Sequence, residues 1–299
     1  MALQIFRFVE TRRAHTSALK PLVQISQLSI HISGNVNTDK SKDGQKSADV
    51  DPNQVDAKPN GWFNKLFVPH INTSKEPHSR LLSASEYIYE MHFHNAKPEA
   101  SELYLSKYES YCKELQSRSK DKAQLVGSWR VDIGGDQDQF VHIWKYLDGY
   151  RQASQLRSLM RTDECLKKAT IDYCKDLRKR ESQFMMSFSF WEHPQPQDNN
   201  SFYEMRSYIL KPGTMIDWAN GWSRGITART NAVAGFFSQI GQLYTVHHLW
   251  RYEDLQVRKD VRENAWRKPG WDSCVAHTVP LIKEMRSRWL APTSFSPIR

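Results

Sequence analysis

The sequence predicts an α+β fold of two tandem ferredoxin-like (β-α-β-β-α-β) repeats, packed sheet to sheet as an intramolecular dimeric α+β barrel. Three observations lead to this prediction. The chain has 299 residues, enough for two ordinary domains with sizeable cores. Only Phe6 and Phe8 among its aromatic residues precede Trp62, so the packed protein is expected to begin near Gly61. Most importantly, the two halves of residues 84–299 resemble each other, which indicates a duplicated structural unit.

The start of the chain has the composition of a targeting segment. Residues 1–33 carry Arg7, Arg12 and Arg13 against a single acid, Glu10, together with several serines and an apolar side. Such a composition predicts a mitochondrial presequence, and the apolar centre of a secretory signal is missing. A disordered tail without a targeting role is the alternative interpretation.

The rest of the chain divides by composition. Residues 34–60 are rich in Lys, Asp, Ser, Asn, Gln and Pro, which predicts a disordered linker. Residues 61–83 are a lead-in segment. The first repeat is assigned to residues 84–193 and the second to residues 201–299, with the sequence His-Pro-Gln-Pro as the breaker between them.

Two pairs of strings align the repeats. Tyr89–Met91 (YEM) recurs as Tyr203–Met205 (YEM), and His142–Tyr146 (HIWKY) matches His248–Tyr252 (HLWRY). The spacing between matched positions falls from 114 to 106, which requires only short deletions in loops of the second copy. The two copies are therefore expected to share one order of strands and helices.

In the first repeat, each expected element has its own local pattern. Pro98 suits the first turn of a helix whose apolar residues recur at helical spacing through Leu115. Gly134 and its neighbours suit the turn of a β-hairpin. The expected elements are a strand Tyr87–Asn95, the helix that reaches Leu115, hairpin strands Leu125–Ile133 and Phe140–Tyr146, a long amphipathic helix from Leu156 to Leu177, and a strand Phe184–Trp191.

The second repeat is expected to follow the same scheme. Pro269, Gly270 and Pro280 should break its last helical region into two pieces. The expected elements are a strand Phe202–Leu210, a helix from Met215 to Ile226, hairpin strands Ala234–Ile240 and Leu243–Tyr252, the broken helix, and a short strand near Phe295.

Alternation along the strands predicts a candidate site between the two sheets. If Val141 and Ile143 pack on the helices, then His142 and Trp144 point into the inter-sheet space. With the matching positions of other strands, the predicted pocket consists of Glu90, His92, His142, Trp144, Glu204, Arg206, His248 and Trp250. Such a layer is either a polar ligand pocket or acid–base site, or a paired polar network that fixes the register of the sheets, because unpaired buried charges are costly.

No catalytic residue, metal ion or cofactor is predicted. The sequence lacks G-x-S-x-G, a P-loop, G-x-G-x-x-G at a helix start, H-E-x-x-H and the protein-kinase motifs. His92 and His94 share one strand face, but isolated His-x-His pairs in strands are usually not metal sites. A non-enzymatic protein is favoured, and enzymatic activity is left open.

Charge and hydropathy limit the kinds of partner. The net charge is +9, of which the part after residue 60 carries +7, a charge that would suit acidic lipid, nucleic acid or an acidic partner. An ordinary soluble surface of mixed charge is the favoured interpretation. No basic patch stands out in the sequence, so nucleic-acid binding is not predicted. The longest apolar run, Phe184–Trp191, is far short of the roughly 20 residues that a membrane-spanning helix needs. No transmembrane segment is therefore expected, and peripheral contact with a membrane is left open.

Several strings of the sequence resemble the NIPSNAP family. The most telling are Leu210–Ile216 (LKPGTMI), Gly235–Gly241 (GFFSQIG), Val246–Trp250 (VHHLW) and Ala265–Lys268 (AWRK), with further likeness at Gly61–Phe63, Val126–Trp129, Asp138–Trp144 and Phe188–Pro196. The resemblance covers about residues 61–299 and is strongest in the second repeat.

The resemblance implies tandem dimeric α+β-barrel domains, residence in mitochondria, usually the matrix, and no established enzymatic activity. It also implies a role in mitophagy, in which members stay at the surface of depolarised mitochondria and recruit autophagy receptors and Atg8-type proteins. Homo- or hetero-oligomers with family members are a further expectation, and an older proposal is vesicle traffic. No catalytic residue can be carried over, because none is assigned to the family.

Two features bear on how such a protein could work. Phe63 and Leu66 fit the aromatic-x-x-aliphatic pattern that docks on Atg8-type proteins by strand addition, although Phe63 could equally pack on the barrel. Alternatively, the inter-sheet cleft could serve a small-ligand-binding protein or an enzyme. That alternative rests on fold analogy, since haem-handling proteins and monooxygenases share the barrel architecture.

Overall fold

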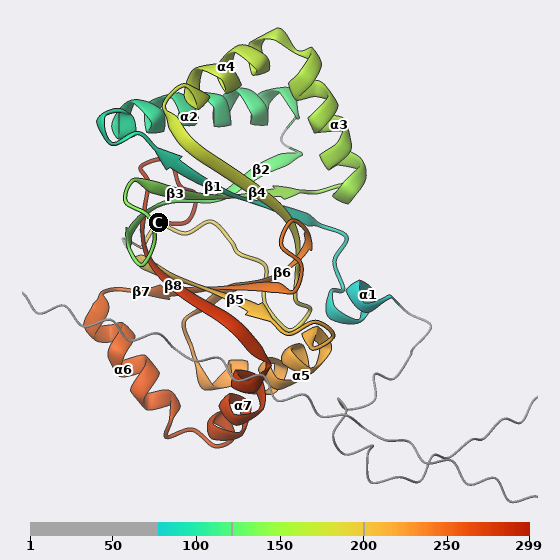
Figure 1. Ribbon diagram of the computed structural model, residues 1–299, viewed down its shortest axis with the longest axis vertical. Coiled ribbons are helices and arrows are strands. Elements are labelled where there is room, and N and C mark those ends of the chain that lie inside the picture. Colours follow the sequence, from blue (N-terminus) through green and yellow to red (C-terminus); the bar gives the residue numbers. More distant parts are fainter. Residues whose placement is uncertain (1–76, 121, 200) are drawn as a thin grey trace, which may run out of the picture. The chain divides into compact units, whose positions relative to one another are not determined.

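The computed structural model describes residues 77–120, 122–199 and 201–299 (Figure 1). The predicted presequence, the linker and the Phe63/Leu66 motif lie outside these residues. Two β-α-β-β-α-β units follow one another in the described chain. The predicted α+β class and the internal duplication are therefore confirmed.

Eight antiparallel strands of the described chain form one closed barrel, and each repeat supplies four of them. The strands of the first repeat are β1 (Ile88–Ala96), β2 (Ala123–Ile133), β3 (Gln139–Tyr146) and β4 (Leu177–Ser187). Those of the second are β5 (Phe202–Leu210), β6 (Ala232–Ile240), β7 (Thr245–Tyr252) and β8 (Ile282–Pro292). In each repeat the first strand pairs with the third and the fourth in the ferredoxin-like order.

Two seams join the sheets at their edges. The second strand of one repeat pairs with the fourth strand of the other, β2 with β8 and β4 with β6. The repeated strings occupy equivalent places in this ring: Glu90 lies opposite Trp144, and Glu204 lies opposite Trp250. The two sheets thus face each other as the walls of one barrel.

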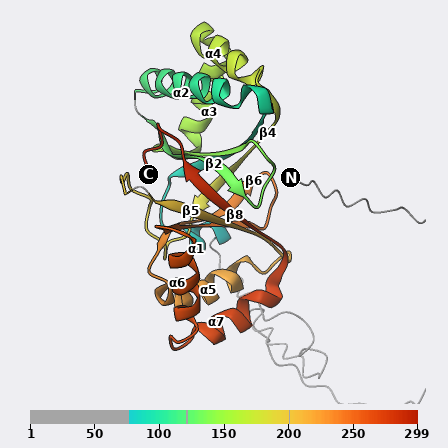
Figure 2. The same cartoon turned by 90° about the vertical axis from the view of Figure 1, so that its left-hand side faces the viewer.

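Helices cover the outer face of each sheet (Figures 1 and 2). The first repeat carries α2 (Ser101–Arg118), α3 (Gly149–Thr162) and α4 (Glu164–Cys174). The second carries α5 (Met215–Gly225), α6 (Leu255–Ala265) and α7 (Trp271–Thr278), and α1 (His78–Leu82) precedes β1. The molecule is therefore layered as helices, sheet, sheet and helices.

The last strand of each repeat differs from the prediction. In the first repeat β4 begins at Leu177, where a helix was expected, and it ends at Ser187. In the second repeat β8 begins at Ile282, whereas a short strand was expected near Phe295. The first halves of both strands carry polar residues on both faces and lack regular strand alternation. They are extended because they complete the ladders with β1 and β5.

The long helix predicted from Leu156 to Leu177 is two helices. The break lies at Asp163, whose Oδ1 accepts hydrogen bonds from the backbone N–H groups of Cys165 and Leu166, each at 3.0 Å. This N-cap satisfies free donors of α4 and so starts a new helix. The expected break in the last helical region of the second repeat is present between α6 and α7.

Candidate functional site

The residues predicted to face the inter-sheet space point the other way, toward the helices. His142 Nε2 and the Tyr104 hydroxyl of α2 are 2.8 Å apart, and Trp144 Nε1 donates to the Tyr108 hydroxyl at 3.0 Å. Val141, one position before His142, is the residue that faces the barrel interior. The predicted direction was wrong because both faces of these strands are buried. Alternation shows which residues share a face, and it leaves open which layer that face meets.

In the first repeat, Glu90 is the centre of a buried ion-pair cluster. Arg157 of α3 donates to one carboxylate oxygen, and His92 Nε2 lies 3.0 Å from the same oxygen. The Tyr146 hydroxyl donates to the other oxygen at 2.5 Å. Burial raises the pKa of the Glu90 carboxyl, but its partners, His92 first, outweigh burial and lower that pKa to about 2.

The second repeat builds an equivalent cluster around Glu204. Arg258 of α6 donates to both carboxylate oxygens, at 3.0 and 2.8 Å, and Arg206 Nη1 donates at 2.9 Å. The Ser287 hydroxyl adds a bond of 2.6 Å. Burial raises the pKa of the Glu204 carboxyl, but the partners, Arg258 first, outweigh it and lower that pKa to about 2.

Both clusters act between sheet and helix. In each repeat an arginine of the helix after the hairpin, Arg157 or Arg258, reaches the glutamate of the first strand. Sequence reasoning missed these arginines, although Gln155–Arg157 (QLR) recurs as Gln256–Arg258 (QVR). The paired-network interpretation fits these residues, with the correction that the network joins sheet to helices.

The remaining two predicted residues lie in an aromatic cluster. His248 has ring centroids of Trp191 and Trp222 at 4.5 Å each, and Trp250 is also packed there. Neither ring nitrogen of His248 has a hydrogen-bond partner within the described residues. Burial, followed by the nearby positive charge of Arg206, holds the pKa of His248 well below its ordinary value.

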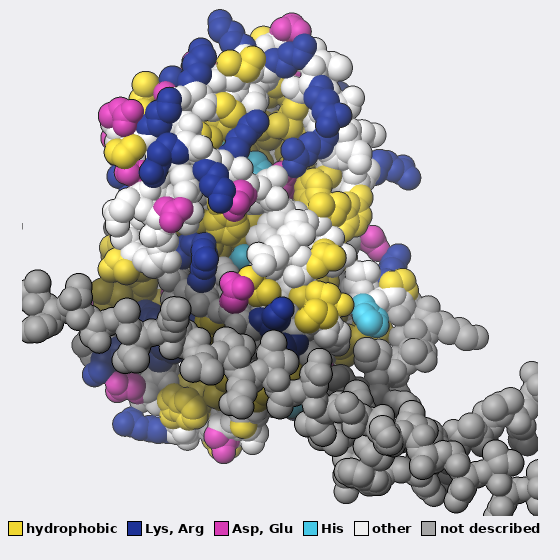
Figure 3. Space-filling model, in the orientation of Figure 1, with side chains coloured by type: hydrophobic (Ala, Val, Ile, Leu, Met, Phe, Trp, Pro, Cys, Tyr) yellow, Lys and Arg dark blue, Asp and Glu magenta, His cyan; other side chains and the backbone are white. Residues whose placement is uncertain are grey.

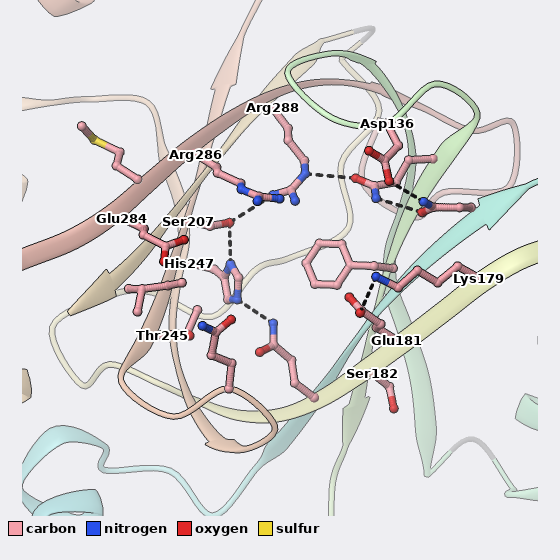
Figure 4. Close-up of a pocket in the computed structure, with 17 residues that line it drawn as sticks. Asp136, Lys179, Glu181, Ser182, Ser207, Thr245, His247, Glu284, Arg286 and Arg288 are labelled. Atoms are coloured by element: carbon pink, nitrogen blue, oxygen red, sulfur yellow. Dashed lines mark hydrogen bonds and ion pairs between the residues drawn. The ribbon is translucent and has the colours of Figure 1, made fainter. Parts of the chain in front are cut away.

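The barrel interior is apolar in the middle and polar at one end. Buried side chains of Met91, Ile143, Met205 and Leu249 fill the middle. At the end where β1 and β5 finish and β4 and β8 begin, there is a cavity of about 500 Å³ (Figure 4). Both repeats line it, and none of the eight predicted pocket residues does.

A hydrogen-bonded chain lines one wall of this cavity. His247 Nδ1 lies 2.8 Å from Ser207 Oγ, and Gln183 Nε2 lies 2.6 Å from His247 Nε2. With the Gln183 amide as donor to Nε2, the proton of the imidazole is on Nδ1 and is donated to Ser207. Burial, and then the charge of Arg288, lower the pKa of His247 to about 3. The imidazole is therefore neutral at pH 7.

The other polar residues of the cavity come from both repeats. Arg288 Nε donates to Gln139 Oε1 at 3.0 Å, and Gln139 Nε2 donates to Asn95 Oδ1 at 2.9 Å (Figure 4). Asn95 Nδ2 in turn donates to Asp136 Oδ2 at 2.6 Å. Sequence reasoning missed Arg288, the basic group of this wall, because it predicted no strand over residues 282–292.

The outer surface carries mixed charge. On the face shown in Figure 3, Lys and Arg side chains gather over the helices of the first repeat, with acidic side chains among them. Lys107 pairs with Asp176 at 2.8 Å, and Lys113 pairs with Glu109 at 2.6 Å. This surface is an ordinary solvated one in which basic groups have acidic neighbours.

Two statements hold for residues 77–299, apart from positions 121 and 200. The helices found there are each too short or too polar to span a bilayer. The same residues contain no group of three His, Cys, Asp or Glu side chains placed to hold a metal ion.

Comparison with known proteins gives one family. The NIPSNAP family model matches residues 89–191 and 203–297, one match in each repeat. The chain is 45% identical over 256 residues to Protein NipSnap of Drosophila melanogaster, covering 84% of this chain and 93% of that protein. It is 43% identical over 246 residues to Protein NipSnap homolog 2 of Homo sapiens, covering 80% and 85% of the two chains.

Solved structures share the barrel at low sequence identity. A candidate monooxygenase from Lactobacillus acidophilus superposes with a TM-score of 0.52 at 10% identity, over 69% of this chain and 93% of that one. A candidate monooxygenase from Fusobacterium nucleatum gives 0.50 at 12% identity, over 70% and 93%. At such identities the likeness extends to the fold alone.

Proposed function

Since the chain belongs to the NIPSNAP family, we propose that it is a non-enzymatic mitochondrial protein that recruits other proteins in mitochondrial quality control. The observation that carries this proposal is the family match in both repeats, because the family resemblance is what implies mitophagy. The Arg-rich, acid-poor start of the sequence supports import into mitochondria.

The barrel has the rigidity expected of a protein scaffold. Its strands close on themselves, and a buried glutamate–arginine cluster ties the helices of each repeat to the sheet. Such a body holds its surface in one shape. The proposed partners are autophagy receptors and Atg8-type proteins, with Phe63 and Leu66, ahead of the barrel in sequence, as the candidate Atg8-docking motif.

An experiment in cells tests this function. The full chain with a C-terminal tag is expressed, mitochondria are depolarised with an uncoupler, and the tag is probed with the outer membrane intact. We expect the tag to become accessible and an Atg8-type protein to co-precipitate. Phe63→Ala with Leu66→Ala should reduce that co-precipitation about tenfold. Phe67→Ala, next to the motif but outside its pattern, is the matched control.

Two results would contradict the proposal. If the protein stays wholly inside depolarised mitochondria and no autophagy receptor is bound to it, the proposed recruiting role is wrong. If the Phe63/Leu66 variant and the control co-precipitate the Atg8-type protein equally, Phe63 and Leu66 are not the docking motif. The proposal of recruitment by another surface of the protein would then stand.

The cavity favours a second candidate function, the binding of a small molecule in the barrel. Its volume of about 500 Å³ lies in the range of ligand sites, and it combines buried polar groups with apolar ones. Native mass spectrometry of the purified full chain tests this candidate. A retained small molecule is expected, and a protein that neither retains one nor binds any compound offered would exclude it.

A further inference from the structure

We propose that the cavity at the end of the barrel binds a small organic monocarboxylate, whose carboxylate group is held by Arg288 and Arg286 of β8. This inference rests on the second candidate function and names the ligand class. It is independent of the helix-facing clusters, whose residues do not line the cavity.

Arg288 is a buried cation without an acidic partner. The residue is 7% exposed, and its hydrogen bonds go to neutral oxygens, Gln139 Oε1 at 3.0 Å and Ser207 Oγ at 3.3 Å. No carboxylate of the described chain lies within ion-pair distance of it, whereas the partly buried Arg206 pairs with Glu204 at 2.9 Å. Because a buried charge is costly unless an anion compensates it, the cavity beside Arg288 is a place for an anion.

A second guanidinium reaches into the same space. Arg286 is two positions earlier on β8, so its side chain leaves the strand on the same face, and Figure 4 shows both arginines pointing into the cavity. Within the described residues, the side chain of Arg286 has neither an ion pair nor a hydrogen bond. Burial first, and then the charge of Arg286, lower the pKa of Arg288. A carboxylate between the two would relieve their repulsion and accept charge-assisted hydrogen bonds from both.

Arg288 is held in place before any ligand arrives. Its Nε is the first donor in the chain of hydrogen bonds through Gln139 and Asn95 to Asp136. This chain orients the guanidinium and links it, through two amides, to a carboxylate at the cavity rim. A fixed donor loses little conformational entropy on binding, which favours affinity for a small ligand.

Ser207 supplies a further donor beside Arg288. Its Oγ accepts from Arg288 Nη1 at 3.3 Å and from His247 Nδ1 at 2.8 Å. Since both neighbours donate, the hydroxyl proton of Ser207 is left to donate to a ligand. The neutral His247 thus sets the direction of the Ser207 hydroxyl, which fits a carboxylate or a polar group next to it.

The balance of charge limits the ligand to one negative charge. The ionisable residues that line the cavity, His247 apart, are Lys179, Arg286 and Arg288 against Asp136, Glu181 and Glu284. Lys179 is already paired with Glu181 at 2.7 Å. That leaves the two arginines against the carboxylates of Asp136 and Glu284, which would repel the additional charge of a phosphate ester or a polycarboxylate, so a monoanion fits better. Phe93, Ile209 and Met285 give its body an apolar surface.

Calorimetry on the purified full chain tests the ligand class. The probes are hexanoate, benzoate and 2-hydroxybutyrate, each with its neutral carboxamide, and inorganic phosphate. We expect at least one acid to bind with a Kd below about 1 mM and its amide to bind about tenfold more weakly. Arg286→Gln, at an exposed position that should not affect folding, and Arg288→Gln should each weaken binding of that acid about tenfold. Arg130→Gln, on β2 outside the cavity, is the control.

The outcomes separate this inference from the function on which it rests. If acids and amides bind equally, if phosphate binds more tightly than every acid, or if neither arginine variant weakens binding, the monocarboxylate assignment is wrong and ligand binding stands. If no probe binds and native mass spectrometry finds no retained molecule, both fail.

Discussion

The two repeats place a histidine at the same point of the third strand and surround it with different chemistry. His142 in β3 is hydrogen-bonded at both ring nitrogens, to the Tyr104 hydroxyl at 2.8 Å and to Ser128 Oγ at 2.9 Å. His248 in β7 has no hydrogen bond within the described chain and packs against indole rings such as that of Trp191. Equivalent backbone positions therefore carry opposite kinds of side-chain environment.

The difference originates in the helix that covers each sheet. Tyr104 and Tyr108 of α2 correspond to Trp218 and Trp222 of α5, so the second repeat lacks the two hydroxyl groups that the first has. The glutamate–arginine pair, by contrast, is present in both. The two repeats thus share the contact that docks a helix on the sheet and differ in the side chains around the buried histidine.

Acid should have the largest effect on stability, and it tests what the repeats share. The pKa of Glu90 and of Glu204 falls from 4.5 to about 2 on folding. Their stabilisation is therefore full above pH 4.5 and is lost as pH falls toward 2, by about 3 kcal/mol for each carboxylate. Urea unfolding at pH 5 and pH 2 measures the loss.

The matched variants Glu90→Gln and Glu204→Gln divide that effect between the repeats. Each should reduce the loss of unfolding free energy between pH 5 and pH 2 by about 3 kcal/mol. An unchanged pH dependence in either variant would show that its cluster does not hold a charged carboxylate in the folded state.

Replacing the two histidines tests where the repeats differ. His142→Phe removes the hydrogen-bond partner of the buried Ser128 hydroxyl and one partner of Tyr104, and should cost about 2 kcal/mol. His248→Phe breaks no hydrogen bond and should leave the unfolding free energy within about 0.5 kcal/mol, or raise it. Urea unfolding at pH 7 gives both values, and equal losses would contradict the assigned difference between the sites.

The smallest effect on stability is expected at the cavity. Arg286→Gln removes an exposed charge that repels Arg288 and has no partner in the described structure. The unfolding free energy should therefore change by less than about 0.5 kcal/mol. Thermal unfolding checks this. A loss above about 1 kcal/mol would assign Arg286 a structural role and weaken the case that its charge is kept for a ligand.

Much of the fold could be predicted from the sequence because duplication doubles each signal. The recurrence of Tyr89–Met91 at Tyr203–Met205 aligns the repeats, and strand alternation with turn residues then gives the order of elements. The same alternation could not give the direction of His142 or Glu90. Apolar side chains fill the barrel on one side of these strands, and aromatic and ion-paired side chains fill the other.

The cavity was beyond prediction for a different reason. Its arginines and Gln183 lie on Leu177–Gln183 and Ile282–Arg288, where polar residues occupy both faces. Local sequence therefore favours no strand, and pairing with the neighbouring strands β1 and β5 of the same repeat imposes one. One signal was available: the two polar stretches hold the same place in each repeat, just before the last apolar residues of the unit.

The seams between β2 and β8 and between β4 and β6 have an evolutionary consequence. One repeat on its own would expose two strand edges, and a second copy could cover them to rebuild the ring. An assembly of identical copies must, however, present the same side chain on both halves. Two halves of one polypeptide are free from that constraint, so one half can carry the apolar Val141 where the other carries His247.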